Sequence, residues 1–290
     1  MVAYDHELII DRFASEKKGV SKKKPLFITE SKTFSADDYP FKEKFHNNQN
    51  RILRLYSDND IRYAVKDQRW VFTIEDVVSF SWLQESNEIF YQLLPSATEE
   101  LLRYWLLHIV LPLYLTTENL YYFLHAGAVQ VDKKSVLFMA DSFGGKSTLT
   151  DFFLKKGHTL ISDDKVATFE ENDTFMAVPS YSYHRPYRAT EDLGIKVDNF
   201  ATEPRPIKAI YLLISVDEDV ETTISPAKGI EKFSSLRFAT EVGLPLFMQE
   251  RFAYLTKLAN NTAIFNVTIP WDLDRLSEVY DAIVAHTKTL

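Results

Sequence analysis

Residues 140–148 combine a glycine pair with a lysine and three hydroxyl side chains, groups that together suit a polyphosphate. The end of this segment, Gly145-Lys146-Ser147, matches the phosphate-binding loop pattern. In that pattern Gly, four free residues and Gly-Lys-Ser/Thr follow a strand and open a helix. Ala140 stands where the pattern has its first Gly. Alanine leaves the turn possible, with a conformational cost if its φ is positive.

The loop predicts a binding site for ATP and Mg²⁺. Backbone N–H groups and a helix N-terminus that point at one place attract phosphate. The Lys146 ammonium would neutralise charge on the β- and γ-phosphates, and the Ser147 hydroxyl would bind Mg²⁺. The residues predicted to contact the nucleotide are Asp141, Ser142, Phe143, Gly144, Gly145, Lys146, Ser147 and Thr148. The alternative interpretation is a chance Gly-Gly turn before a helix.

Two adjacent carboxylates, Asp163 and Asp164, follow a predicted strand at 160–162, 17 and 18 residues after Lys146. Mg²⁺ prefers hard oxygen ligands, and an attacking hydroxyl needs an acceptor for its proton. Neighbouring side chains on extended chain point in opposite directions, so one pair can serve both needs. A surface turn is the alternative, and the preceding loop is what favours the functional interpretation.

Two further side chains are candidates for the same site. His125 lies 21 residues before Lys146, after the apolar segment 121–124. Its alternative role is that of a core histidine bonded to a backbone carbonyl. Arg185 lies in the Tyr- and Pro-rich segment 181–188. Its planar guanidinium suits bidentate binding of phosphoryl oxygens, and a surface loop arginine is the alternative.

The elements that would hold these residues alternate between strand and helix after residue 120, which predicts an α/β domain. A strand at 136–139 precedes the loop, a helix at 148–156 follows it, and a helix at 273–287 closes the chain. The strongly apolar segment 207–214 predicts a central strand. Further strands are expected at 122–131, 159–162, 166–169 and 262–268.

Shorter β-prone segments come before that domain and predict a small α+β module. Its strands are expected at 52–56, 61–65, 70–74 and 88–93, while residues 1–50 look least structured. The capping-box pattern at 96–99 predicts a helix from Ala97, which Pro112 would kink or end. The expected division is a β-rich module at 1–95, a connecting helix at 96–120 and a catalytic domain at 121–290.

Composition limits the functional classes. The formal net charge of −8 argues against nucleic acid as a general partner, and the lack of cysteine excludes disulfides. The longest apolar run, 101–115, is shorter than the ~20 residues of a membrane span, and the polar first residues show no signal peptide. We expect a soluble cytoplasmic protein, and the sequence leaves a homo-oligomer open.

Taken together, His125, the loop at 140–147 and Asp163-Asp164 resemble, in order and spacing, the kinase domain of bacterial HPr kinase/phosphorylase and its relatives. The resemblance covers roughly residues 120 to 285. It implies a phosphate-loop kinase fold similar to that of phosphoenolpyruvate carboxykinase, with transfer of the γ-phosphate of ATP to serine. It also implies that Asp163 is the base, Asp164 the metal-side carboxylate and His125 their partner, although the two Asp roles are exchangeable.

Two departures from that family bear on function. Ala140 replaces the first Gly of the loop, and the family segment Glu-Ile-Arg-Gly-Leu-Gly, which is associated with phosphorolysis, has only a faint echo at 190–195. The resemblance therefore predicts a kinase without the reverse reaction, acting on serine in a peptide or protein. The alternatives are a small-molecule kinase for free serine or a sugar, and a non-catalytic nucleotide-binding regulatory module. Glu191 is a further candidate for the metal side.

Overall fold

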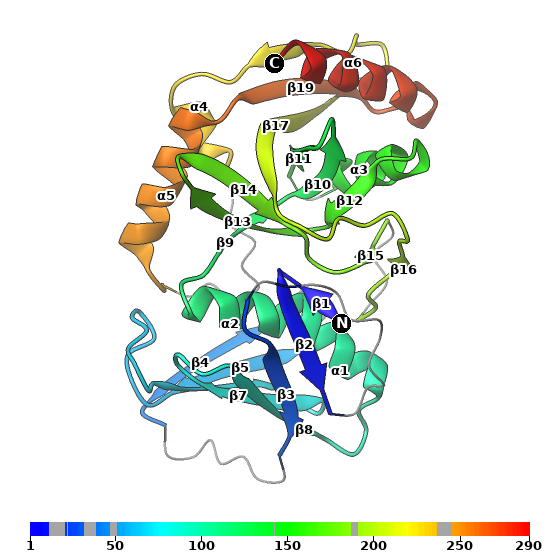
Figure 1. Cartoon of the computed structure of the whole chain (residues 1–290). Helices are drawn as coiled ribbons and strands as arrows, with labels where there is room; N and C mark the ends of the chain where they lie inside the picture. Colours follow the sequence, from blue (N-terminus) through cyan, green and yellow to red (C-terminus); the bar gives the residue numbers. More distant parts are fainter. Residues whose placement is uncertain are drawn as a thin grey trace. The chain divides into compact units, whose positions relative to one another are not determined.

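The structure of the protein is a computed structural model. It describes residues 1–11, 21, 23–31, 39–46, 51–141, 143–186, 191–236 and 245–290 (Figure 1). The described chain divides into two compact units. The first unit holds the chain up to Tyr121 together with 191–193 and 245–248. The second unit holds the described parts of 122–186, 194–236 and 249–290.

An eight-stranded sheet dominates the described part of the first unit, in the order β1-β2-β3-β8-β7-β6-β5-β4. Strand β3 is parallel to β2 and β8, and the other neighbours are antiparallel. The strands are β1 (Val2–Ala3), β2 (His6–Ile10), β3 (Leu26–Glu30), β4 (Phe41–His46), β5 (Ile52–Ser57), β6 (Arg69–Ile74), β7 (Val78–Leu83) and β8 (Glu88–Leu93).

Two expectations for this sheet were wrong. Residues 1–50 contribute β1 to β4, although they looked least structured. Strand β4 is an edge strand rich in charged residues, a composition that protects sheet edges and resembles a loop in the sequence. The segment 61–65 is a turn and not a strand, and β7 was not anticipated.

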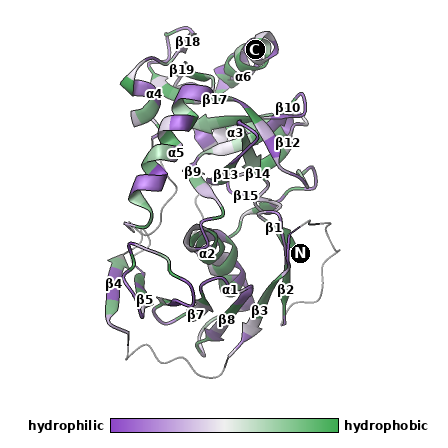
Figure 2. Ribbon diagram, turned by 60° about the vertical axis from the view of Figure 1, so that its left-hand side comes forward, coloured by the Kyte–Doolittle hydropathy of each residue, from purple (hydrophilic) through white to green (hydrophobic). Residues whose placement is uncertain are grey.

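A continuous helical segment follows the sheet as α1 (Glu99–Trp105), a π-helical turn η1 (Leu106–Val110) and α2 (Leu111–Thr117). It begins after Thr98, whose hydroxyl accepts from the Leu101 N–H, and not at Ala97. Pro112 does not end it. Because proline has no N–H to donate, the helix continues in a π turn, in which the Leu111 N–H bonds to the Leu106 carbonyl. Figure 2 colours α2 largely as hydrophobic, in agreement with its burial.

The second unit contains a nine-stranded mixed sheet in the described residues, with the path β12-β10-β11-β17-β14-β13-β9. Strand β19 lies beside β17, and β18 beside β19. The strands are β9 (Tyr122–His125), β10 (Gly127–Val131), β11 (Lys134–Met139), β12 (Thr159–Ser162), β13 (Lys165–Glu171), β14 (Thr174–Val178), β17 (Arg205–Val216), β18 (Ile224–Pro226) and β19 (Ile264–Pro270). The expected central strand is confirmed in β17, which is parallel to β11 and β19.

The expected single strand at 122–131 is broken at Ala126. Strand β9 pairs with β13, whereas β10 pairs with β11 and β12. The chain therefore changes partners directly after His125. This break leaves His125 at the end of a strand, beside the turn between β12 and β13.

Helices cover both faces of the second sheet (Figure 1). Helix α3 (Lys146–Lys155) and helix α6 (Leu276–Thr289) pack on one face, and α5 (Met248–Asn261) packs on the other. Two short helices, α4 (Ile230–Ser234) and the 3₁₀ turn η2 (Leu273–Arg275), complete the described helices of this unit. The unit is a mixed α/β domain. In the described chain, no helix has the length and apolar character to span a membrane.

His6 in β2 makes the stability of the first unit depend on pH. The His6 ring is buried, and its Nδ1 lies 2.7 Å from the Tyr4 carbonyl oxygen. Burial is the main cause that lowers the pKa of His6 to about 4, and Lys23 lowers it further while the Tyr4 carbonyl opposes. The unfolded chain therefore binds more protons than the folded chain at pH values from about 6.5 down to 4.

We expect the free energy of unfolding to fall by about 2 kcal/mol between pH 7 and pH 5 because of His6. Denaturant unfolding at both pH values measures this loss. The His6→Asn variant keeps a donor near the Nδ1 position but does not titrate, so its loss should be smaller by that amount. Equal pH dependence in the two proteins would contradict this account of His6.

Candidate functional site

The predicted phosphate-binding loop connects β11 to α3. Among its described residues, Phe143, with φ 66°, and Gly145, with φ 79°, are left-handed, whereas Ala140 has no positive φ. The conformational cost considered for alanine at position 140 therefore does not arise. The loop is tight at Gly144 instead, where a Cβ would lie 2.8 Å from the Ala140 Cβ. Ser142, a predicted nucleotide contact, lies outside the described residues.

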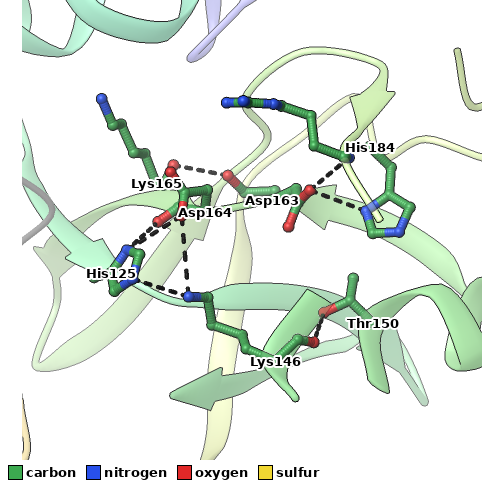
Figure 3. A network of polar contacts seen from close by, with 9 residues as sticks. His125, Lys146, Thr150, Asp163, Asp164, Lys165 and His184 are labelled. Atoms are coloured by element: carbon green, nitrogen blue, oxygen red, sulfur yellow. Dashed lines mark hydrogen bonds and ion pairs between the residues drawn. The ribbon is translucent and has the colours of Figure 1, made fainter. Parts of the chain in front are cut away.

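Lys146 begins α3, two residues before the expected helix start, and its side chain is only 9% exposed. The Lys146 Nζ lies 3.0 Å from His125 Nε2 and 3.9 Å from Asp164 Oδ1 (Figure 3). The Thr150 hydroxyl donates to the Lys146 carbonyl at 3.0 Å, one turn along the helix. The ammonium is thus held against two groups from other elements, the end of β9 and the turn between β12 and β13.

His125 joins the lysine to Asp164. Its Nδ1 lies 3.3 Å from both the carbonyl oxygen and the Oδ1 of Asp164. Burial lowers the pKa of His125, Asp164 opposes this shift, and Lys146 adds to it. A neutral ring fits both contacts, since Nδ1–H donates to Asp164 while Nε2 accepts from the Lys146 ammonium.

The two carboxylates lie in a tight turn and not on extended chain. Strand β12 ends at Ser162 and β13 begins at Lys165. The Lys165 N–H donates to the Asp163 carbonyl at 2.8 Å, and the Ser162 hydroxyl donates to the Lys165 carbonyl at 2.7 Å. Asp164 is left-handed, with φ 69°. This turn, and not the alternation of a strand, lets the neighbouring carboxylates contact different groups.

Asp163 and Asp164 contact different parts of the chain, and the partners of Asp163 are His184 and Arg185. The Asp163 side chain is 4% exposed, and its Oδ2 accepts from the Arg185 backbone N–H at 2.8 Å and lies 3.0 Å from His184 Nδ1. Its Oδ1 is buried without a hydrogen-bond partner among the described residues. Arg185, predicted for its guanidinium, thus contacts Asp163 through its backbone. Sequence reasoning missed His184, because no spacing pattern singled it out.

The remaining predicted residues lie at the loop and at the start of α3. Asp141 and Thr148 are exposed, and Ser147 is half-buried in the first turn of the helix. Glu191 lies in the first unit, where its carboxylate accepts from Arg51 at 2.8 Å.

No group of three or more His, Asp and Glu side chains in the described chain is arranged to hold a metal. A Mg²⁺ ion here would need phosphate or water oxygens as additional ligands, as is usual for this ion.

A two-stranded sheet of β15 (Tyr183–His184) and β16 (Ile195–Lys196) carries His184. Gly194 precedes β16 with φ 88°, and a Cβ there would lie 2.3 Å from the His184 carbonyl oxygen. Gly157 has a similar φ of 90°, but a Cβ there would meet nothing within 4 Å. An alanine at position 157 would therefore meet backbone strain alone, whereas an alanine at position 194 would meet the same strain and a steric overlap.

We expect Gly194→Ala to destabilise the protein by about 1–3 kcal/mol more than Gly157→Ala, which meets only the cost of a left-handed alanine. The excess comes from displacement of the His184 backbone. Denaturant unfolding of both variants measures the difference. Equal losses would show that the β15–β16 pair does not constrain His184 in this way.

No protein-family model matches the chain, and neither does any curated protein. Among solved structures, the Hpr(Ser) kinase/phosphatase from Coxiella burnetii aligns with 58% of this chain and 91% of its own. The identity is 14% and the TM-score 0.37. A likeness this distant carries no argument for function, which must come from the residues themselves.

Proposed function

We propose that this chain is an ATP- and Mg²⁺-dependent kinase that transfers the γ-phosphate to a hydroxyl, with serine of a peptide or protein as the acceptor. One observation carries the proposal. Lys146 from the start of α3, His125 from the end of β9 and Asp164 from the β12–β13 turn meet at distances of 3.0 to 3.9 Å. A lysine at a strand-to-helix loop and a nearby carboxylate are among the groups that phosphoryl transfer uses.

The residues at the loop fit ATP and Mg²⁺. The backbone of residues 141–148 would hold the phosphates, and the loop is tight at Gly144, where a Cβ would lie 2.8 Å from the Ala140 Cβ. Ser147 and Asp164 offer the hard oxygen atoms that Mg²⁺ prefers. When bound, the metal ion neutralises charge on the β- and γ-phosphate oxygens. The Lys146 ammonium adds a fixed positive charge at the same place.

The two aspartates have different roles in this proposal, one toward the proton and the other toward the metal ion. Asp163 takes the proton of the acceptor hydroxyl, because its buried Oδ1 has no hydrogen-bond partner in the described chain. Asp164 lies on the lysine side, which suits a metal-side carboxylate. His125, whose pKa is lowered mainly by burial, contacts both Asp164 and the Lys146 ammonium and so holds the two groups in place. The Arg185 guanidinium is a further candidate for the phosphoryl oxygens.

The test is transfer from ATP to a panel of acceptors: serine peptides, free serine and sugars. We expect Mg²⁺-dependent release of ADP, at a rate that rises when serine peptides are added. Transfer to free serine or a sugar alone would overturn the acceptor class and leave a small-molecule kinase. Binding of Mg²⁺–ATP with no transfer would leave a nucleotide-binding regulatory module, and no binding would overturn the proposal entirely.

A further inference from the structure

We infer that His184 is a positioning residue. It holds the Asp163 carboxylate by one oxygen, Oδ2, which leaves the other oxygen, Oδ1, as the atom that would take the proton of the acceptor hydroxyl. The catalytic consequence of this inference rests on the proposed function, whereas the positioning itself does not. The contacts that His184 and Arg185 make with Asp163 support the positioning.

Two donors converge on one oxygen of the Asp163 carboxylate (Figure 3). His184 Nδ1 lies 3.0 Å from Oδ2, and the Arg185 backbone N–H donates to the same atom at 2.8 Å. The side chains of His184 and Asp163 are 3% and 4% exposed, so water does not compete freely with these bonds. Hydrogen bonds to a buried charged group are among the stronger ones, and two on one oxygen fix the plane of the carboxylate.

The contact with Asp163 defines which nitrogen of the His184 ring carries the proton. Nε2 is buried without a hydrogen bond, and the nearest carboxylate oxygen, Asp151 Oδ1, lies 3.7 Å away. Asp151 instead pairs with Lys155 at 2.6 Å through its other oxygen. Because an ionised carboxylate only accepts hydrogen bonds, the contact with Asp163 requires the His184 proton on Nδ1. His184 therefore acts on Asp163 as a donor.

The second oxygen of Asp163 is the one that this arrangement leaves for chemistry. A buried carboxylate oxygen without a partner is unfavourable, and such a group in a folded protein calls for an explanation such as a catalytic role. In the proposed reaction the serine O–H proton passes to Asp163 Oδ1 as the serine oxygen bonds to the γ-phosphorus. The bond between that phosphorus and the β–γ bridging oxygen breaks, and ADP leaves with the electron pair.

Two substitutions at position 184 distinguish the loss of the hydrogen-bond donor from the loss of side-chain packing. His184→Leu removes the donor, whereas His184→Asn keeps an amide N–H near the position of Nδ1. His158→Leu is the matched control, since His158 is another hydrogen-bonded histidine of the same unit, with its ring nitrogens at the Gln130 carbonyl and the Tyr280 hydroxyl. We expect His184→Leu to lower kcat by about 10–100-fold with little change in KM for ATP, since losses of this size follow removal of supporting hydrogen bonds. His184→Asn should recover most of that loss.

Hydrogen exchange of the Arg185 amide gives a second readout that needs no kinase activity. We expect protection of this amide to fall in His184→Leu and to persist in His184→Asn and His158→Leu. If that pattern appears in a protein that transfers no phosphate, the proposed function fails and the positioning by His184 stands. Unchanged protection and turnover in His184→Leu would overturn the inference. So would a His184→Asn variant that is as impaired as His184→Leu in both readouts.

Discussion

Replacing Lys146 with alanine is expected to abolish phosphate transfer from ATP while the second unit stays folded. The substitution removes the ammonium that would neutralise the β- and γ-phosphates and that contacts His125 at 3.0 Å. Loss of a preorganised charged group of this kind lowers turnover by at least about 10²–10³-fold. Turnover under saturating Mg²⁺–ATP, together with denaturant unfolding, measures both parts of the prediction.

The matched control is Lys156→Ala. Lys156 lies directly after the same helix, is exposed, and places its Nζ over the Phe152 ring at 5.2 Å from the centroid. We expect this variant to keep the turnover of the unchanged protein, because its charge lies at the other end of α3. Near-normal turnover of Lys146→Ala would remove the phosphate-binding assignment of the loop.

Asp163→Asn is expected to lower kcat by about 10²–10⁴-fold and to leave nucleotide affinity largely intact. The amide oxygen can take the place of Oδ2 and still accept from His184 and the Arg185 N–H. The amide nitrogen then replaces Oδ1, and it cannot accept the proton of the acceptor hydroxyl. Steady-state turnover and nucleotide titration of the same variant separate these effects.

Asp164→Asn serves as the counterpart of that variant. We expect it to weaken nucleotide affinity and to raise the Mg²⁺ concentration needed for half-maximal turnover, since Asp164 lies 3.9 Å from the Lys146 Nζ on the phosphate side. The opposite pattern, with Asp164→Asn affecting only turnover and Asp163→Asn only metal dependence, would exchange the two roles. If neither substitution matters, the pair has no part in catalysis.

The second unit was largely predictable because its strands are long apolar runs bounded by clear turns. The β11–loop–α3 sequence, the central strand β17 and the closing helix all lie close to where the apolar pattern indicated. The break at Ala126 was not predictable in the same way. Both sides of it are equally apolar, and only the exchange of pairing partners from β13 to β11 and β12 separates them.

The first unit was less predictable because local preference and tertiary context disagree there. The segment 61–65 has β-prone residues but forms a turn. Strand β4 has the charged composition of a loop but pairs along β5 at the sheet edge. Pro112 signals a helix end, yet the buried helix continues past it through a π turn. In each case the packing of neighbouring elements outweighs the local sequence.

Within the candidate site, the residues that the sequence predicted come from recognisable patterns, whereas the others are defined only by the fold. Lys146 and Asp164 were predicted from the loop and the Asp-Asp pair, and His125 from the family resemblance; the structure brings the three side chains together. His184 reaches Asp163 only because β15 and β16 pair beside the turn. The contact of Arg185 with Asp163 is made by its backbone N–H, so its residue type carries no signal for it.

The most direct test of the central claim follows the γ-phosphate of labelled ATP in the presence of Mg²⁺ and serine-containing peptides. The unchanged protein and the Lys146→Ala variant are assayed side by side, and the chemical form of the label is identified. The kinase proposed here predicts label in phosphoserine with the unchanged protein alone, and only when Mg²⁺ is present. Label that never leaves ATP for any hydroxyl acceptor, or that leaves it equally with both proteins, would contradict the claim.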